Sequence, residues 1–341
     1  MRIATWNVEW FTALFDEDDV LAMDDVPSSR HRISRARQAE AVATVMTALD
    51  ADGLMVIEAP DTNGRRSTTR ALEGFAAAFG LRTRRAVTGF PNDTQQEIAF
   101  LFDPDVLEPR HDPRGPQTGK KGGRAAPRFD GVFRIDLDID ATEDLVRFSK
   151  PPLELSVTTR SGRAFRVIGA HLKSKAPHGA VGRDAVMRLS IANRRKQLAQ
   201  AIWLRARIDG HLEAGEPLMV MGDLNDGPGL DEYEDLFGRS SVEIVTGGEG
   251  ETPMYDPHAV RALRSKLSAA PTSARFWIKL ERRYLQALLD YIMLSPDLAA
   301  LDPRWRIWHP FDDPDCWAVP ELRQALLDAS DHFPVTLDIE L

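Results

Sequence analysis

Short, mostly apolar segments that end on a polar residue recur along this chain. They are the segments 54–57 before Glu58, 165–170 before His171, and 217–221 before Gly222 and Asp223. Apolar runs this short fit buried β-strands better than helices, which need about ten residues or more. Each of these strands would therefore carry a polar side chain to the edge of a buried sheet.

Four further strands are predicted, at 3–10, 98–102, 291–294 and 335–341. The last of these is the clearest, because apolar and polar residues alternate strictly from Val335 to Leu341. That period of two is typical of a half-buried strand. It follows directly on Asp331 and His332, so an acid and an imidazole would be held beside a rigid element.

Three segments carry helical patterns, at 32–49, 71–79 and 185–207. In the first, apolar residues recur at steps of three and four, and Gly80 after the second is a common helix C-cap. The acidic stretch 16–25 is interpreted as a solvated loop. Strands alternate with helices without regular βαβ spacing, which predicts an α/β (α+β) fold with a two-layered sheet core flanked by helices.

The composition is that of an ordinary soluble globular protein, with 341 residues, 43% hydrophobic and 28% charged. The net charge of −9 does not suggest an electrostatic nucleic-acid binder, although a basic cleft can lie in an acidic protein. The single Cys316 excludes an internal disulfide framework and a cysteine-based zinc site. With no signal peptide and no long apolar run, we expect a cytoplasmic protein without a membrane span.

The chain shows no internal repeat and no low-complexity linker, so we expect one domain over residues 1–341. Two segments are predicted to be insertions. Residues 110–128 combine glycines, prolines and basic residues and are interpreted as a mobile basic loop. The second, near 252–283 within a Gly- and charge-rich stretch that starts at 247, is predicted to be partly helical. No obligate protein partner is inferred.

The polar residues at the predicted strand edges form a set with narrow chemistry: Asn7, Glu58, Glu97, His171, Asp223, Asn225, Asp290, Asp331 and His332. Carboxylate and amide oxygens without cysteine suit a hard cation such as Mg²⁺ or Mn²⁺. Glu58 is the best single ligand, because an apolar strand would present its carboxylate at a sheet edge.

Two histidines and an Asp-x-Asn pair supply the groups for proton transfer and phosphate contact. His171 and His332 can act as acid, base or phosphate donor near neutral pH. Asp223 and Asn225 are two residues apart on a segment taken as extended, so both side chains can point to one face. Together with a cation, this set fits metal-assisted hydrolysis of a phosphoester.

Five blocks of sequence, in this order along the chain, resemble the endonuclease/exonuclease/phosphatase superfamily and its bacterial nuclease-like branch. They are Ala4-Thr5-Trp6-Asn7-Val8-Glu9-Trp10, Met55-Val56-Ile57-Glu58, Gly169-Ala170-His171-Leu172-Lys173-Ser174-Lys175, Met221-Gly222-Asp223-Leu224-Asn225-Asp226, and Leu289-Asp290-Tyr291-Ile292 with Ser330-Asp331-His332-Phe333-Pro334-Val335. The resemblance implies a four-layered α/β/β/α sandwich of two packed mixed β-sheets flanked by helices.

The resemblance also implies a role for each matching residue. The metal ligands would be Glu58 with Asn7 and, as in some relatives, Asp331. Asp223 would orient or deprotonate the attacking water, while Asn225, His332 and Lys173 would contact the phosphate. His332 would pair with Asp290 or Asp331, and Glu97 would orient His171, which supports the leaving side. Which histidine serves as base stays open. Ile57 departs from the glutamine common at that position in the family, so the surroundings of the metal ligand would differ.

Three functions follow, in order of preference. The first is a Mg²⁺-dependent phosphodiesterase or nuclease, endonuclease- or exonuclease-like, in which Mn²⁺ would substitute. The second is a phosphatase or phosphodiesterase for a small-molecule or lipid-headgroup phosphoester, which the acidic charge favours. The third is a catalytically silent binding module. The substrate partner is therefore nucleic acid or another phosphoester.

Overall fold

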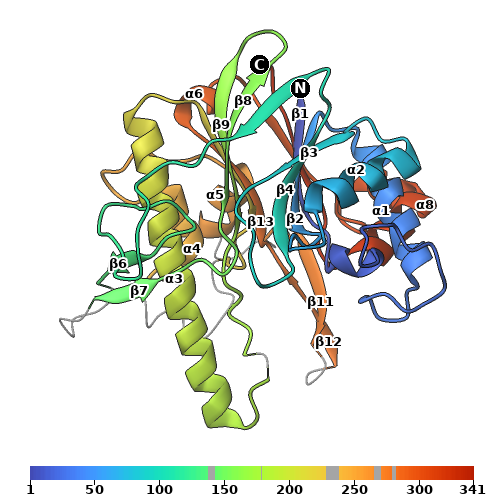
Figure 1. Ribbon diagram of the computed structural model, residues 1–341, viewed down its shortest axis with the longest axis horizontal. Helices are drawn as coiled ribbons and strands as arrows, with labels where there is room; N and C mark the ends of the chain where they lie inside the picture. The colour runs from blue at the N-terminus through green and yellow to red at the C-terminus, as the bar shows by residue number, and fades with distance from the viewer. Residues whose placement is uncertain (137–142, 178, 228–237, 265–269, 279–281) are drawn as a thin grey trace.

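The fold is described from a computed structural model that covers the chain except residues 137–142, 178, 228–237, 265–269 and 279–281 (Figure 1). Within the described residues the strands are β1 (Arg2–Asn7), β2 (Gly53–Ala59), β3 (Arg85–Thr88), β4 (Glu97–Phe102), β5 (Leu107–His111), β6 (Phe133–Ile135), β7 (Asp144–Val146), β8 (Leu153–Thr159), β9 (Ala164–His171), β10 (Leu218–Asp223), β11 (Ala274–Ile278), β12 (Arg283–Ala287), β13 (Asp290–Leu294), β14 (Arg304–Ile307) and β15 (Val335–Asp338). The helices are η1 (Phe11–Leu14), α1 (Arg35–Leu49), α2 (Thr68–Phe79), α3 (Arg183–Glu213), α4 (Ser241–Thr246), α5 (Pro257–Arg264), α6 (Pro296–Ala299), α7 (Pro314–Ala318) and α8 (Pro320–Ala329).

Two mixed sheets form the centre of the molecule. The first has six strands in the order β14-β15-β1-β2-β4-β3, and its β1 and β2 run parallel. The second has five strands in the order β13-β10-β9-β8-β5, and its β9 and β10 run parallel. The remaining neighbours in both sheets are antiparallel. Both sheets are therefore mixed, as predicted.

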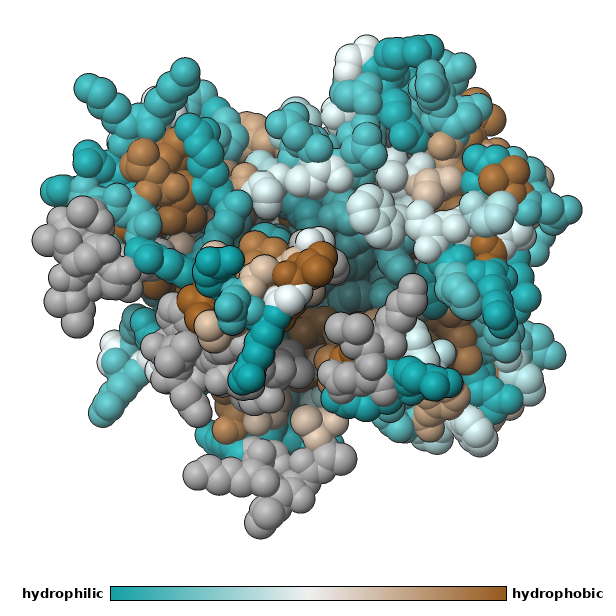
Figure 2. Space-filling view, turned by 90° about the horizontal axis from the view of Figure 1, so that it is seen from below, coloured by the Kyte–Doolittle hydropathy of each residue, from teal (hydrophilic) through white to brown (hydrophobic). Residues whose placement is uncertain are grey.

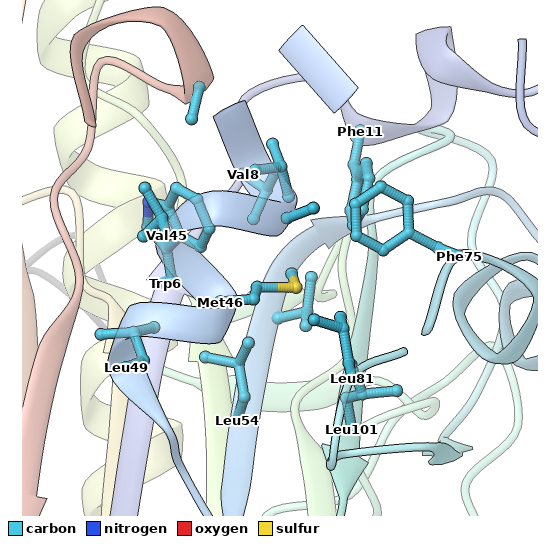
Figure 3. Close-up of a cluster of buried hydrophobic side chains, with 14 of the residues drawn as sticks. Trp6, Val8, Phe11, Val45, Met46, Leu49, Leu54, Phe75, Leu81 and Leu101 are labelled. Carbon is cyan, nitrogen blue, oxygen red and sulfur yellow. The ribbon is translucent and has the colours of Figure 1, made fainter. Parts of the chain in front are cut away.

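The core lies in three apolar layers, one between the sheets and one on each outer face. Ile3, Met55 and Val167 belong to the layer between the sheets. The outer layer of the six-stranded sheet packs against α1, α2 and α8, where Trp6 and Phe75 lie (Figure 3). The helix α3 covers the outer face of the other sheet (Figure 1). This arrangement confirms the predicted four-layered α/β/β/α sandwich.

The predicted elements are mostly correct, with differences at their ends. Helix α1 starts after Ser34, whose side chain accepts a hydrogen bond from Arg37 N, and α2 ends at Gly80 in the left-handed conformation (φ 64°). The first strand, however, stops at Asn7 rather than residue 10. Trp10 has a positive φ of 53° and opens η1, so the chain turns there.

The acidic stretch 16–25 is not fully solvated as predicted. The side chain of Asp19 is buried and lies 2.6 Å from Arg70 Nη2 and 3.5 Å from Arg66 Nε. It also accepts a hydrogen bond from Ser67 N (2.7 Å). The stretch therefore fastens the start of α2 to the loop that follows η1.

The two segments predicted as insertions both contact the body of the fold. In the first, the carbonyl of Pro127 accepts hydrogen bonds from Trp203 and Arg207 on α3 (both 2.9 Å). The second contains α5, as its helical prediction required, and also the β11–β12 hairpin, which was not predicted. Within the described part of the chain, no helix has the length and apolar character needed to cross a bilayer.

Candidate active site

The predicted site residues converge because three strands end, and a fourth begins, at the same edge of the two sheets. Asn7 closes β1, His171 closes β9 and Asp223 closes β10. In the second sheet Asp223 pairs with His171 on one side and with Asp290, the first residue of antiparallel β13, on the other. In Figure 1 these ends point downward, and Figure 2 shows that side hollowed near its centre, with hydrophilic residues in its depth.

Gly222 allows β10 to deliver Asp223 to this edge. Its φ is +130°, a conformation that residues with a side chain rarely adopt. A Cβ atom at this position would lie 2.1 Å from the backbone oxygen of Ala170 on β9. The glycine in Met221-Gly222-Asp223 is therefore required by close strand contact immediately before the acid.

Asp223 is the central residue of the site and is buried. Its Oδ2 accepts a hydrogen bond from Asn7 Nδ2 (3.1 Å) across the gap between the two sheets. The same oxygen lies 3.5 Å from His171 Nε2 and 4.0 Å from His332 Nε2. Burial raises the pKa of Asp223 to about 7, and nearby Asp290 adds to the effect, while His332 opposes it.

Asn225 reaches Asp223 through a tight turn, not along the extended segment that was predicted. Its φ is 51°, and its backbone N donates to Asp223 Oδ1 (2.7 Å). The side-chain Nδ2 donates to Asp223 Oδ2 and to Leu172 O (both 3.1 Å). The amide is thus placed beside the acid, but its N–H groups already have partners in this state.

His332 pairs with Asp290, which resolves the alternative left open by the sequence. Its Nδ1 lies 2.8 Å from Asp290 Oδ2, and its backbone N donates to Ser330 Oγ (3.1 Å). Burial lowers the pKa of the imidazole, but the charges of Asp290 and Asp223 outweigh it, so the pKa lies well above its usual value. His332 is therefore held as an imidazolium.

His171 is placed beside Asp223 and beside a lysine that sequence reasoning missed. Lys150 Nζ lies 3.2 Å from His171 Nε2. Burial, together with the positive charges of Lys150 and His332, holds the pKa of His171 well below its usual range. Burial also lowers the pKa of Lys150, although Glu58 and Asp223 oppose this. The pKa values of the two histidines are thus shifted in opposite directions, which favours a neutral His171 and a cationic His332.

Glu58 lies at a β-bulge on the edge of the first sheet. The pairing of β2 with β4 shifts register between Ile57 and Ala59, and Glu58 has a φ of 61°. Its half-buried carboxylate accepts a hydrogen bond from Trp10 N (2.9 Å). Asn7, the last residue of β1, pairs with Ile57, so Glu58 follows directly on the residue opposite Asn7, near the end of the neighbouring strand β2.

The donor set of the site fits a divalent cation. Asn7 Oδ1 and Asp290 Oδ1 are buried and have no hydrogen-bond partner among the described residues. Buried oxygens without a partner are costly, and binding a hard cation satisfies such oxygens. Asp223, Asp290 and His332 each bring a ligand atom to within 4.8 Å of the others. This possible metal site uses residues that were predicted to be catalytic.

Three other predicted site residues lie apart from these contacts. The carboxyl group of Glu97 accepts hydrogen bonds from Asn92 N (3.2 Å) and Nδ2 (2.8 Å), and His171 Nδ1 has no partner among the described residues. The expected pairing of Glu97 with His171 is therefore absent. Asp331 interacts with Glu9, whose pKa is raised by burial and by Asp331.

The third of these residues, Lys173, follows the His171 strand and is half-buried. Its backbone N donates to Gln200 Oε1 on α3 (2.8 Å). Burial and the neighbouring Lys196 lower the pKa of its amine. Among the described lysines it is instead Lys150 that contacts the His171 ring (Nζ to Nε2, 3.2 Å), so the cation expected beside the histidine comes from a different segment.

Ser273 is a second residue that sequence reasoning missed. Its Oγ donates to Asp290 Oδ2 (2.8 Å) and accepts from the backbone N of Leu289 and of Asp290 (both 3.0 Å). It lies in the segment predicted to be an insertion, next to β11. Neither Ser273 nor Lys150 follows an apolar run, so the signal that identified the other residues does not mark them.

Comparison with known proteins identifies a family for the chain. A family model described as Endonuclease/Exonuclease/phosphatase family matches residues 4–332. Among solved structures, the chain is similar to a 3′ phosphatase, NExo, from Neisseria bound to a product DNA hairpin (14% identity, TM-score 0.49, all of both chains covered). It is also similar to truncated TDP2 of Caenorhabditis elegans (14%, 0.47, 98% of this chain and 96% of that one) and to the human Nocturnin catalytic domain with bound sulfate (15%, 0.46, 100% and 94%). No curated protein sequence matches the chain.

Proposed function

The chain belongs to the endonuclease/exonuclease/phosphatase family and is a phosphoesterase of that family, and on this premise we propose that it is a Mg²⁺-dependent phosphodiesterase that cleaves nucleic acid by activating water. Mn²⁺ would substitute for Mg²⁺. The observation that carries the proposal is the buried Asp223 carboxylate, which lies within 4.0 Å of both histidines and bonds Asn7 across the two sheets.

In this proposal Asp223 is the general base. A base works best when its pKa lies near the working pH, and burial raises the pKa of Asp223 to about 7. Asn7 and Asn225 hold its oxygens by hydrogen bonds, so the lone pair that faces the site is fixed. Asp223 would take the proton of a water molecule as that water attacks phosphorus.

His332 would stabilise the negative charge that develops on the phosphate. Asp290 holds Nδ1, which leaves the Nε2 side of the imidazolium directed toward the site around Asp223. A charged donor fixed in a water-poor site favours a developing oxyanion more than a solvated one does. The buried Ser273 hydroxyl keeps Asp290 in place, so the donor is positioned before substrate arrives.

His171 and Lys150 would act together on the other side of Asp223. The neutral imidazole can donate from one nitrogen, while the ammonium 3.2 Å away brings positive charge near a phosphate oxygen. A cation held by Glu58 and by Asn7 Oδ1, which has no hydrogen-bond partner among the described residues, would offset the charge of the phosphate and of its leaving oxygen.

The test is hydrolysis of a substrate panel with Mg²⁺, Mn²⁺ or EDTA. The panel contains plasmid DNA, RNA, nucleotides, phospholipid headgroups and bis(p-nitrophenyl) phosphate. We expect activity that EDTA removes and that Asp223→Asn and His332→Ala reduce by about 10²–10⁴-fold. His31→Ala, at an exposed histidine before α1, is the matched control and should keep full activity. Full activity after removal of the metal would refute the proposal.

The acidic net charge favours a second candidate, a phosphatase or phosphodiesterase for a small molecule or lipid headgroup. Salt separates the two. A nuclease should lose affinity steeply as salt rises, because binding releases counterions from the polyanion, whereas a small-substrate enzyme should not. If no member of the panel is hydrolysed with either metal, the chain is a binding module that has kept the fold.

A further inference from the structure

The β11–β12 hairpin, which starts next to His332 of the candidate active site, carries exposed aromatic side chains. Trp277 on β11 pairs with Tyr284 on β12, and their rings lie edge to face with centroids 5.0 Å apart. The two side chains are 52% and 48% exposed. Large rings exposed together on one face are unusual unless they bind something.

An arginine and two more exposed rings extend this face. The guanidinium of Arg275 lies 3.5 Å from the ring centroid of Tyr284 and 5.2 Å from that of Phe311. Phe311 lies 6.4 Å from Trp317, whose side chain is 53% exposed. We call Trp277, Tyr284, Arg275, Phe311 and Trp317 the aromatic row.

The aromatic row is joined directly to the candidate active site. Ala274 forms a β-bridge with His332, and Arg275 N donates to Asp331 O (2.7 Å). Ser273, the residue before β11, holds Asp290. In Figure 1 the hairpin extends beyond the sheets at the end where β1, β9 and β10 finish. A polymeric substrate that extends from the site past His332 would therefore contact the aromatic row next.

We propose that the aromatic row binds single-stranded nucleic acid, stacking unpaired bases beside the phosphodiester that is cleaved. The inference rests on the proposed function and names its substrate class. Unpaired bases expose the faces that stack on Trp, Tyr and Phe, whereas the bases of a duplex keep those faces inside the helix. Arg275, held between two rings, is placed to contact a phosphate between stacked bases.

The position of Arg275 argues against a lipid surface as the ligand. Insertion of these rings into a bilayer would carry the guanidinium between Tyr284 and Phe311 toward hydrocarbon, where a charge is costly. Bound to a nucleic-acid strand, the same group keeps an anionic partner. The row also adds a cation at the site edge of an acidic chain.

The test measures binding of a fluorescent 12-nucleotide single strand, and of the blunt duplex of the same sequence, to the full chain carrying Asp223→Asn with Mg²⁺ present. Trp277→Ala and Tyr284→Ala should each weaken the affinity for the single strand by about tenfold, and duplex affinity should change less. Tyr255→Ala is the matched control, because Tyr255 is 43% exposed and bridges Leu294 at the other end of β13; it should bind like the parent.

Unchanged single-strand affinity in both hairpin variants would overturn the inference, and so would an equal loss for strand and duplex. Binding of phosphatidylcholine–phosphatidylglycerol vesicles that depends on Trp277 would overturn it in favour of a membrane. Hydrolysis of bis(p-nitrophenyl) phosphate by the wild-type protein is measured in parallel. If that hydrolysis occurs but binding does not need the row, only the inference fails; if the wild type hydrolyses none of the panel, the proposed function fails.

Discussion

Replacing Glu97 with glutamine tests how the burial of this carboxyl group makes the stability of the protein depend on pH. The carboxyl group is buried at the start of β4, and among the described residues its hydrogen-bond donors belong to neutral groups, including Asn92. Burial raises the pKa of Glu97 to about 7, against an ordinary value of 4.5, and nearby Asp61 adds to the effect. Glu97→Gln keeps the shape of the side chain and removes the charge.

The expected effect on stability follows from proton linkage. The pKa of Glu97 is higher in the folded protein than in the unfolded chain. Between pH 4.5 and 7 the folded protein therefore holds a proton that the unfolded chain has already lost. The stabilising effect of that proton is complete below pH 4.5 and is lost as pH rises through 7. At about 1.4 kcal/mol per pH unit, the loss approaches about 3 kcal/mol at pH 8, of which about 2 kcal/mol or more falls between pH 5 and 8.

The measurement is urea unfolding of the wild type and of Glu97→Gln in EDTA at intervals from pH 5 to 8.5. The free energy of unfolding of the variant should rise relative to that of the wild type as pH rises. Glutamine has one acceptor oxygen fewer than the two that face Asn92, and this loss costs about 1 kcal/mol at every pH. Glu108→Gln, at an exposed glutamate on β5, controls for removing one acid. A constant difference between variant and wild type from pH 5 to 8.5 would refute the reasoning.

Three further changes test how the site is held. Ser273→Ala should lower the free energy of unfolding by about 1–3 kcal/mol, since two buried N–H groups lose their acceptor. It should also lower kcat about tenfold or more; unaltered kcat would show that the hydroxyl does not position Asp290 and, through it, His332. Lys150→Met removes a charge that lowers the pKa of His171, so the acid limb of the pH profile of kcat/KM should move to higher pH; an unmoved limb would exclude this coupling. Gly222→Ala should unfold the protein or lower its stability in thermal unfolding by about 3 kcal/mol or more. Gly64→Ala, at a glycine with open space around it, should change the melting temperature little. Equal melting temperatures of the two variants would contradict the strand contact at Gly222.

The fold and the centre of the site could be predicted because their signals are local. Glu58, His171 and Asp223 each end an apolar run, and the ends of parallel strands meet at one sheet edge. His332 precedes a strictly alternating strand. In each case the strand that carries the residue is adjacent to it in the sequence, so the local pattern was enough to predict where on the fold the residue lies.

The remaining features depend on contacts between residues far apart in the chain. Lys150 and His171 are brought together by two separate segments, and Ser273 reaches Asp290 only because the β11–β12 hairpin folds back and sets Ser273 beside Ala287. The burial of Asp19 depends on arginines about fifty residues away. No periodicity in a single sequence encodes such pairings. The turn at Asn225 is different, because an Asx turn at Asp223 is a local signal that the extended prediction overlooked.

The charges of the site explain how an acidic chain can act on an anionic substrate. Three carboxylates, of Glu58, Asp223 and Asp290, face two cations, the His332 imidazolium and the Lys150 ammonium. A phosphodiester adds one more negative charge to this group, which has little water to screen it. A divalent cation in the site would restore the charge balance. Its charge would offset the negative charge of the group with its substrate, and the unpartnered oxygens of Asn7 and Asp290 could serve as its ligands. Cation and substrate should therefore bind with positive cooperativity, and the net charge of −9 is no obstacle to a nuclease whose site is completed by metal.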